Sequence, residues 1–101
     1  MKEEIRSDTW IWVVVQDPGA NEQYLGQVDE DKSESFIPAF YQKEDAQQCL
    51  IQLKTEQGKK YEAQAICFGE LAKDAEKNDF MIFILTRDGE ILQKISPEAG
   101  F

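Results

Sequence analysis

Histidine is absent from this 101-residue chain. Histidine is the commonest general base, the commonest activator of a nucleophile and the commonest ligand of transition metals. Ser-His-Asp and Cys-His catalysis are therefore excluded within one chain. The glycine-rich motifs that cradle nucleotide phosphates are missing too, so nucleotide binding has no support. We expect no cofactor and no enzymatic activity.

Cysteine and long apolar runs are also scarce. Cys49 lies on the apolar stripe of a predicted helix and Cys67 in a predicted strand, and neither belongs to a CxxC motif. We expect both to be buried, reduced and inert, with a disulfide or a reactive thiol as the alternatives. No segment approaches the roughly 20 apolar residues that span a bilayer, and the N-terminal MKEEIRSDT lacks the apolar core of a signal peptide. These absences predict a cytoplasmic protein that is not bound to a membrane.

Basic residues are few, since 11 Lys and Arg stand against 20 Asp and Glu, which gives a net charge of -9. Proteins that bind nucleic acids neutralise phosphates with clustered basic residues, whereas the adjacent basic pair here is Lys59 and Lys60 in a predicted loop. We therefore expect no nucleic-acid partner. Anionic membrane surfaces are disfavoured by the same charge argument.

The length suits one hydrophobic core, and 42% of the residues are apolar. We predict a single domain over residues 1–101, with an ordered core at about 9–95 and short flexible termini. The most informative run is residues 35–53, where an apolar strand around Pro38 changes directly into a helical stripe of Ala46, Cys49, Leu50 and Leu53. Because proline donates no hydrogen bond, we expect this strand at an edge of the sheet.

The apolar patterns predict six strands and two helices. We expect strands at about 10–16, 23–28, 35–41, 60–68, 80–85 and 91–95, and helices at about 43–56 and from Gly69 to a left-handed cap at Asn78. The order β-β-β-α-β-α-β-β predicts an α+β fold with a mixed, mainly antiparallel sheet and both helices on one face. Two strands look apolar on both sides, so we expect the other face to be covered by a second copy in a homodimer.

Two tryptophans are the candidate interface. Trp10 and Trp12 are two residues apart in a predicted strand, so they share one face of the sheet. If that face lacks helices, they would anchor a dimer or a protein partner. Aromatic residues on strands are, however, most often part of the core.

The acidic residues give little evidence of a metal or catalytic site. Asp29, Asp31 and Ser33 have the spacing of EF-hand ligands, but Glu34 stands where glycine is needed and Phe40 where a bidentate glutamate is needed. We therefore predict no metal site in this exposed loop. Glu62 is either an exposed residue of a sheet edge, which we favour, or a buried acid with a chemical role.

Residues 35–85 resemble a known family. The phrase SFIPAFYQKEDAQQCL, the later helix GELAKDAEKNDF and the strand MIFIL are similar to the N-terminal domain of the enhanced-serine-sensitivity (SseB-like) family, and the strand-helix phrase also occurs in chloroplast Tic22-like proteins. Gln42 replaces the usual Ser or Thr cap, and no Asn-Pro follows Leu85. The resemblance implies a small α+β domain that acts through protein contacts.

Two functions of different class follow. The first is a non-enzymatic protein-interaction or regulatory module that binds a partner, or itself as a homodimer, through an open sheet face. The second is a small-molecule-binding or minor catalytic domain that uses a buried carboxylate such as Glu62. The missing histidine and the missing catalytic motifs favour the first.

Overall fold

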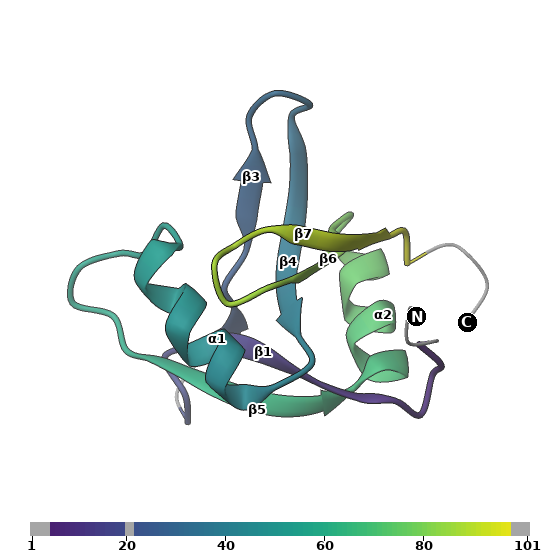
Figure 1. Ribbon diagram of the computed structural model, residues 1–101, viewed down its shortest axis with the longest axis horizontal. Helices are drawn as coiled ribbons and strands as arrows, with labels where there is room; N and C mark the ends of the chain where they lie inside the picture. Colours follow the sequence, from purple (N-terminus) through teal and green to yellow (C-terminus); the bar gives the residue numbers. More distant parts are fainter. Residues whose placement is uncertain (1–4, 20–21, 98–101) are drawn as a thin grey trace.

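A mixed sheet of seven strands forms the centre of the molecule in the computed structural model, which describes residues 5–19 and 22–97 (Figure 1). The elements in chain order are β1 (Trp10–Gln16), β2 (Gln23–Tyr24), β3 (Gln27–Asp29), β4 (Glu34–Phe40), α1 (Lys43–Cys49), the 3-10 turn η1 (Leu50–Gln52), β5 (Tyr61–Cys67), α2 (Phe68–Lys77), β6 (Met81–Leu85) and β7 (Ile91–Ile95). The predicted α+β class and the mainly antiparallel sheet are confirmed.

The long strand β1 organises one half of the sheet. Along one edge it pairs antiparallel with β5 over the whole length of both strands. Along the other edge it pairs with β4 at Trp12 and Val13 and with β2 at Val15 and Gln16. The other half is built on β4, which pairs parallel with β6, and β6 pairs antiparallel with β7.

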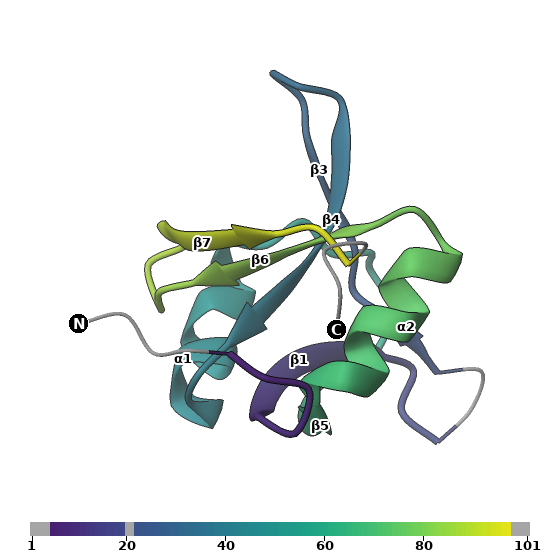
Figure 2. The same ribbon diagram turned by 90° about the vertical axis from the view of Figure 1, so that its right-hand side faces the viewer.

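Between β2 and β3 the chain changes its pairing partner from β1 to β4. One strand was predicted at 23–28, but the chain leaves β1 after Leu25, whose N–H donates to the Val14 carbonyl, and then pairs with β4 as β3. The extra strand comes from this change of partner. Beyond it, β3 and the start of β4 form a hairpin that projects away from the rest of the fold (Figure 1, Figure 2).

Pro38 lies in a central strand, so the predicted edge position of this strand is wrong. On one edge β4 pairs with β6, and on the other it pairs with β3 up to Phe36 and with β1 from Ala39. Pro38 therefore falls at the break between two partners. A residue without an N–H costs least where one edge of its strand is unpaired.

The two helices cover opposite faces of the sheet, which corrects the prediction that both lie on one face. Ile11, Val13 and Val15 of β1 belong to one core cluster, and Trp12 and Val14 contact another. The first cluster contains Phe68, Leu71, Ala72 and Ala75 of α2, and the second contains Ala46 and Cys49 of α1. We call these sides the α2 face and the α1 face. Strands that are apolar on both sides are thus buried by one helix on each side, and the premise of a sheet-face homodimer is wrong.

Both helices differ from their predicted bounds. α1 ends at Cys49 and tightens into η1, seven residues before the predicted end at Glu56. Gln42 makes no side-chain cap, and the last turn of α1 has no basic residue, so little holds this helix beyond its buried side. The left-handed residue after α2 is Asp79, with φ 58°, and not Asn78. Neither helix is long and apolar enough to cross a bilayer.

Candidate functional site

A groove of about 540 Å³ opens on the α1 face between β3, η1 and the loop that joins β6 to β7. Its volume falls within the range of about 300–1,000 Å³ that is usual for ligand sites. Its lining is Val28, Asp29, Glu30, Asp31, Phe36, Cys49, Gln52, Leu53, Phe83, Leu85, Asp88, Gly89 and Ile91. We call this site the acidic groove.

The floor of the acidic groove is apolar and aromatic. The rings of Phe36 and Phe83 are stacked with their centres 4.1 Å apart and their planes 13° from parallel. Val28 and Ile91, which also line the groove, leave 58% and 47% of their surfaces exposed. The ammonium group of Lys94 lies 5.1 Å from the centre of the Phe83 ring. Lys94 of β7, the cross-strand neighbour of Phe83, thus lays its own alkyl-ammonium side chain against this aromatic ring.

The rim of the acidic groove carries uncompensated negative charge. Asp29, Glu30, Asp31 and Asp88 all line it. Glu30 is paired with Lys54 at 3.0 Å, but within the described part of the chain no salt bridge reaches the other three. Burial, and then the charge of Asp88, raises the pKa of the Cys49 thiol. The groove therefore favours positive charge and keeps this thiol protonated.

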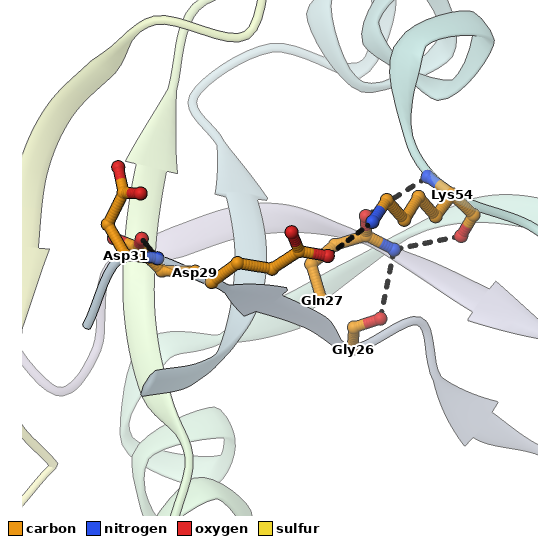
Figure 3. A network of polar contacts seen from close by, with 6 residues as sticks. Gly26, Gln27, Asp29, Asp31 and Lys54 are labelled. Atoms are coloured by element: carbon orange, nitrogen blue, oxygen red, sulfur yellow. Dashed lines mark hydrogen bonds and ion pairs between the residues drawn. The ribbon is translucent and has the colours of Figure 1, made fainter. Parts of the chain in front are cut away.

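Side-chain hydrogen bonds fix the acidic turn against the chain that follows η1 (Figure 3). The amide of Gln27 accepts from the Lys54 N–H at 3.0 Å and donates to the Lys54 carbonyl and the Gly26 carbonyl, each at 2.9 Å. The Asp31 N–H donates to the carboxylate of Asp29 at 3.2 Å, which closes the turn. Gln27 thus joins β3 to the chain after η1 and holds the backbone at one wall of the groove.

The two predicted interface tryptophans lie outside the acidic groove. They share the α1 face, as predicted, but this face is covered by α1 over much of its area. Trp12 packs against the core there, with the Lys43 ammonium 5.7 Å from its ring centre. Trp10, at the start of β1 beside Cys67, is 64% exposed. An interface at these two residues stays a prediction.

The structure provides no buried acid for the predicted catalytic alternative. Glu62 is exposed on β5, as the favoured prediction had it. Over residues 5–19 and 22–97, no polar or charged residue is buried and no cluster of three or more Cys, Asp or Glu could hold a metal ion. Both cysteines are free thiols; Cys49 is buried as expected, whereas Cys67 is half-buried.

A second cavity, of about 390 Å³, lies on the α2 face between β1, β2, β5 and α2. Its polar groups include Glu22, Gln64, Glu70 and the pair of Tyr24 and Asp74. The hydroxyl of Tyr24 donates to Asp74 Oδ2 at 2.5 Å. Burial, and then this hydrogen bond, raises the pKa of the Tyr24 hydroxyl. Because this donor and acceptor satisfy each other, the acidic groove is the better candidate for binding.

Only one wall of the acidic groove could be predicted from the sequence. The acidic residues 29–34 were predicted in an exposed loop, but nothing in the sequence indicated that Asp88 and Ile91 lie beside them. Their proximity depends on the parallel pairing of β4 with β6, which places Phe36 and Phe83 on neighbouring strands. The exposed apolar residues Ile91 and Leu92 after the Asp-Gly turn were the available signal.

Comparison of the chain with models of protein families, with curated proteins and with solved structures found no match. The resemblance to SseB-like and Tic22-like proteins therefore stays a prediction.

Proposed function

We propose that the protein is a non-enzymatic interaction module whose acidic groove binds a basic, apolar peptide segment of another protein. The observation that carries this proposal is the combination of exposed apolar side chains, Val28 and Ile91, with three carboxylates on the rim that no salt bridge reaches in the described part of the chain. A segment with lysine or arginine next to leucine or phenylalanine can place its apolar side chain on the floor and its positive charge beside the rim. An acidic segment, or one without apolar side chains, cannot make both contacts.

The floor would supply most of the affinity. Burial of apolar surface contributes about 25 cal/mol per Å², and exposed Val28 and Ile91 still have surface to bury. A basic side chain of the partner can lay its apolar stem along the floor while its charge reaches the rim. Lys94 already makes this kind of contact with Phe83.

The rim would supply selectivity and a faster association rate. Each exposed carboxylate contributes only about 0.2–1 kcal/mol to an ion pair, so no single acid decides binding. Three acids around one groove, in a chain with a net charge of -9, attract a cationic segment together. The same potential repels nucleic acids and acidic peptides.

The rim is tested with a fluorescein-labelled 12-residue peptide of alternating lysine and leucine, whose binding is followed by fluorescence anisotropy. Replacing Asp29, Asp31 and Asp88 with asparagine together should weaken binding about tenfold, or about 1.4 kcal/mol. The control changes Asp8, Glu22 and Glu62, which lie outside the groove, to their amides and so alters net charge equally. Equal losses in both triple variants would contradict the assignment to this groove.

The floor is tested by two matched substitutions on β7. Ile91→Ser removes an exposed apolar side chain that lines the groove, and Leu92→Ser removes one of similar exposure that does not. We expect Ile91→Ser to weaken peptide binding about five- to tenfold and Leu92→Ser to leave it unchanged, since only the first loses apolar contact. A similar effect of both would overturn the proposal.

A further inference from the structure

A different part of the molecule, the free edge of β5, has the properties of a self-pairing surface. β5 pairs with β1 alone and lies at the border of the fold in both views (Figure 1, Figure 2). In antiparallel ladders, the backbone groups of alternate residues point to opposite edges. The Lys60 carbonyl accepts from Asp17 and the Phe68 N–H donates to Thr9, so even-numbered residues bond towards β1. The backbone groups of Tyr61, Ala63, Ala65 and Cys67 therefore point to the free edge.

This edge lacks the backbone features by which proteins protect edge strands, although it carries one charged side chain, the exposed Glu62. Such edges are normally short, bulged or interrupted by proline, because a long regular edge recruits another strand. β7 has only five residues and borders an irregularity between Ile84 and Leu85, and β2 and β3 have two and three residues. β5 has seven residues in unbroken register with β1 and contains neither proline nor glycine. Among the described residues, no backbone group pairs with Tyr61, Ala63 or Ala65 at this free edge, whereas the Cys67 carbonyl accepts the first bond of α2.

We propose that this edge pairs antiparallel with the same edge of a second copy, about a two-fold axis at Gln64, so that the two sheets become one. With the axis at Gln64, Tyr61 faces Cys67 of the second copy and Ala63 faces its Ala65. The outward N–H and C=O groups then pair across the axis, except the Cys67 carbonyl, which begins α2, and this gives about six hydrogen bonds. An axis at Ala63 or Ala65 would leave one outward residue unpaired in each copy.

The side chains suit this register on both faces. On the α1 face the facing pair is alanine with alanine, and Ala65 is exposed. On the α2 face Gln64, which donates to Glu22 at 3.2 Å, meets its own counterpart, and exposed Glu62 faces Ile66 of the second copy, so no two carboxylates of the paired strands are directly opposed. The start of β5, with Lys60 before it, meets the start of α2 of the second copy, where Glu70 lies exposed. This pairing offsets part of the repulsion between two acidic chains.

The register also gives exposed Trp10 a neighbour. Trp10 is opposite Cys67 on the α1 face, and Cys67 would face Tyr61 of the second copy. The indole ring is long enough to extend over Cys67 towards that tyrosine, which would bury part of its exposed surface. A single pair of strands buries less area than the roughly 1,200 Å² of a stable interface, so we expect a weak dimer.

The register is tested by cross-linking the full chain. Gln64→Cys places two thiols opposite each other across the axis, at a separation that a disulfide spans, about 4.5 Å between Cα atoms. Glu62→Cys is the matched control on the same edge and face, because its two thiols would lie about 14 Å apart. With oxidised glutathione, we expect a covalent dimer on a non-reducing gel for Gln64→Cys only. Equal cross-linking of both variants, or none in either, would overturn the register.

The edge itself is tested by sedimentation over a range of concentration up to about 1 mM. The wild-type chain should approach twice 11.6 kDa. Ala65→Pro removes an outward N–H and no bond to β1, so it should weaken dimerisation at least tenfold, while Ala65→Val, which keeps the N–H, should not. The proposal would be refuted if the wild type stayed monomeric at every concentration, or if Ala65→Pro dimerised as well as the wild type. The remaining occupant of this edge would then be an extended segment of another protein. Cross-linking of Gln64→Cys decides the question if Ala65→Pro does not fold.

Discussion

At the scale of single residues, the hydrogen bond between Tyr24 and Asp74 connects β2, which has only two residues, to α2. A bond to a charged acceptor in a half-buried site contributes about 1–2 kcal/mol. We expect Tyr24→Phe to lower the free energy of unfolding by about 1 kcal/mol, measured by urea denaturation at pH 7. In a double-mutant cycle, Asp74→Ala should add little to the loss in the Tyr24→Phe background. Additive losses would mean that the two side chains are not coupled.

The same hydroxyl predicts a loss of stability in alkali. Burial, and then the bond to Asp74, raises the pKa of Tyr24 above its ordinary value of about 10. The unfolded chain therefore loses this proton at a lower pH than the folded chain does. The stabilisation is complete below about pH 10 and falls as the pH rises above it. Between about pH 9.5 and 11 the unfolding free energy of the wild type should decline more steeply than that of Tyr24→Phe; parallel declines would contradict this.

The exposure of a residue, and the face of the strand on which it lies, could be predicted from the sequence where they depend only on residue type and strand alternation. The exposed position of Glu62 follows from the rarity of buried acids, and it is confirmed. The shared face of Trp10 and Trp12 follows from strand alternation, and the unbroken pairing of β1 with β5 confirms it. The left-handed residue after α2 was predicted one position too early, at Asn78. Asn and Asp both tolerate this conformation, so the sequence alone does not choose between neighbours. Here the Phe80 N–H donates to the Ala75 carbonyl, and Asp79 takes the left-handed conformation.

At the scale of elements, Gly69 holds the segment before β1 against the start of α2. Its N–H donates to the Ser7 carbonyl at 2.8 Å, and a Cβ at this position would lie 3.0 Å from that oxygen and 3.2 Å from the Ser7 Cβ. Alanine gains up to about 1 kcal/mol of helix propensity over glycine, but overlap with a backbone atom costs about 1–3 kcal/mol. We expect Gly69→Ala to destabilise the fold by about 1 kcal/mol in urea denaturation. A gain in stability would show that the segment can shift freely.

A control for this substitution lies on the same helix. Lys73 is exposed on α2 and makes no salt bridge in the described part of the chain. Lys73→Ala should change the free energy of unfolding by less than about 0.5 kcal/mol, because the two residues have similar helix propensity. A loss comparable to that of Gly69→Ala would locate the effect in the helix as a whole rather than at Ser7.

The limits of sequence reasoning at this scale are clearest in β4 and α1. The apolar pattern located both elements, but Pro38 suggested an edge strand because the pattern does not show which partners a strand has on each side. The break between β3 and β1, which admits this proline, is a feature of the whole sheet. α1 was predicted too long because Leu50 and Leu53 continue the helical stripe. In the structure Leu50 lies in a 3-10 turn and Leu53 is extended, because tertiary packing overrides the local pattern.

At the scale of the whole molecule, the arrangement of the helices decides what the surface can bind. Six strands and two helices could be predicted from apolar period, but period does not show on which face each helix packs. Since β1 and β6 send alternate side chains to both core clusters, each face needed one helix. Two of the surfaces left open are the groove beside α1 and the edge of β5, and neither could be predicted without the strand order.

The net charge of -9 predicts that salt should stabilise the fold and weaken the proposed peptide complex. Mutual repulsion of the acids opposes the compact state, and the Debye length falls from about 30 Å at 0.01 M salt to about 8 Å at 0.15 M. We expect the midpoint of thermal unfolding to rise by a few degrees between about 10 and 300 mM NaCl, followed by circular dichroism.

Over the same range the lysine-leucine peptide should bind at least about fivefold more weakly, because its attraction to the rim is screened. The triple asparagine variant of the rim should depend less on salt than the wild type does, because three of the charges that attract the peptide are gone. A salt dependence as steep in that variant as in the wild type would place the peptide outside the acidic groove.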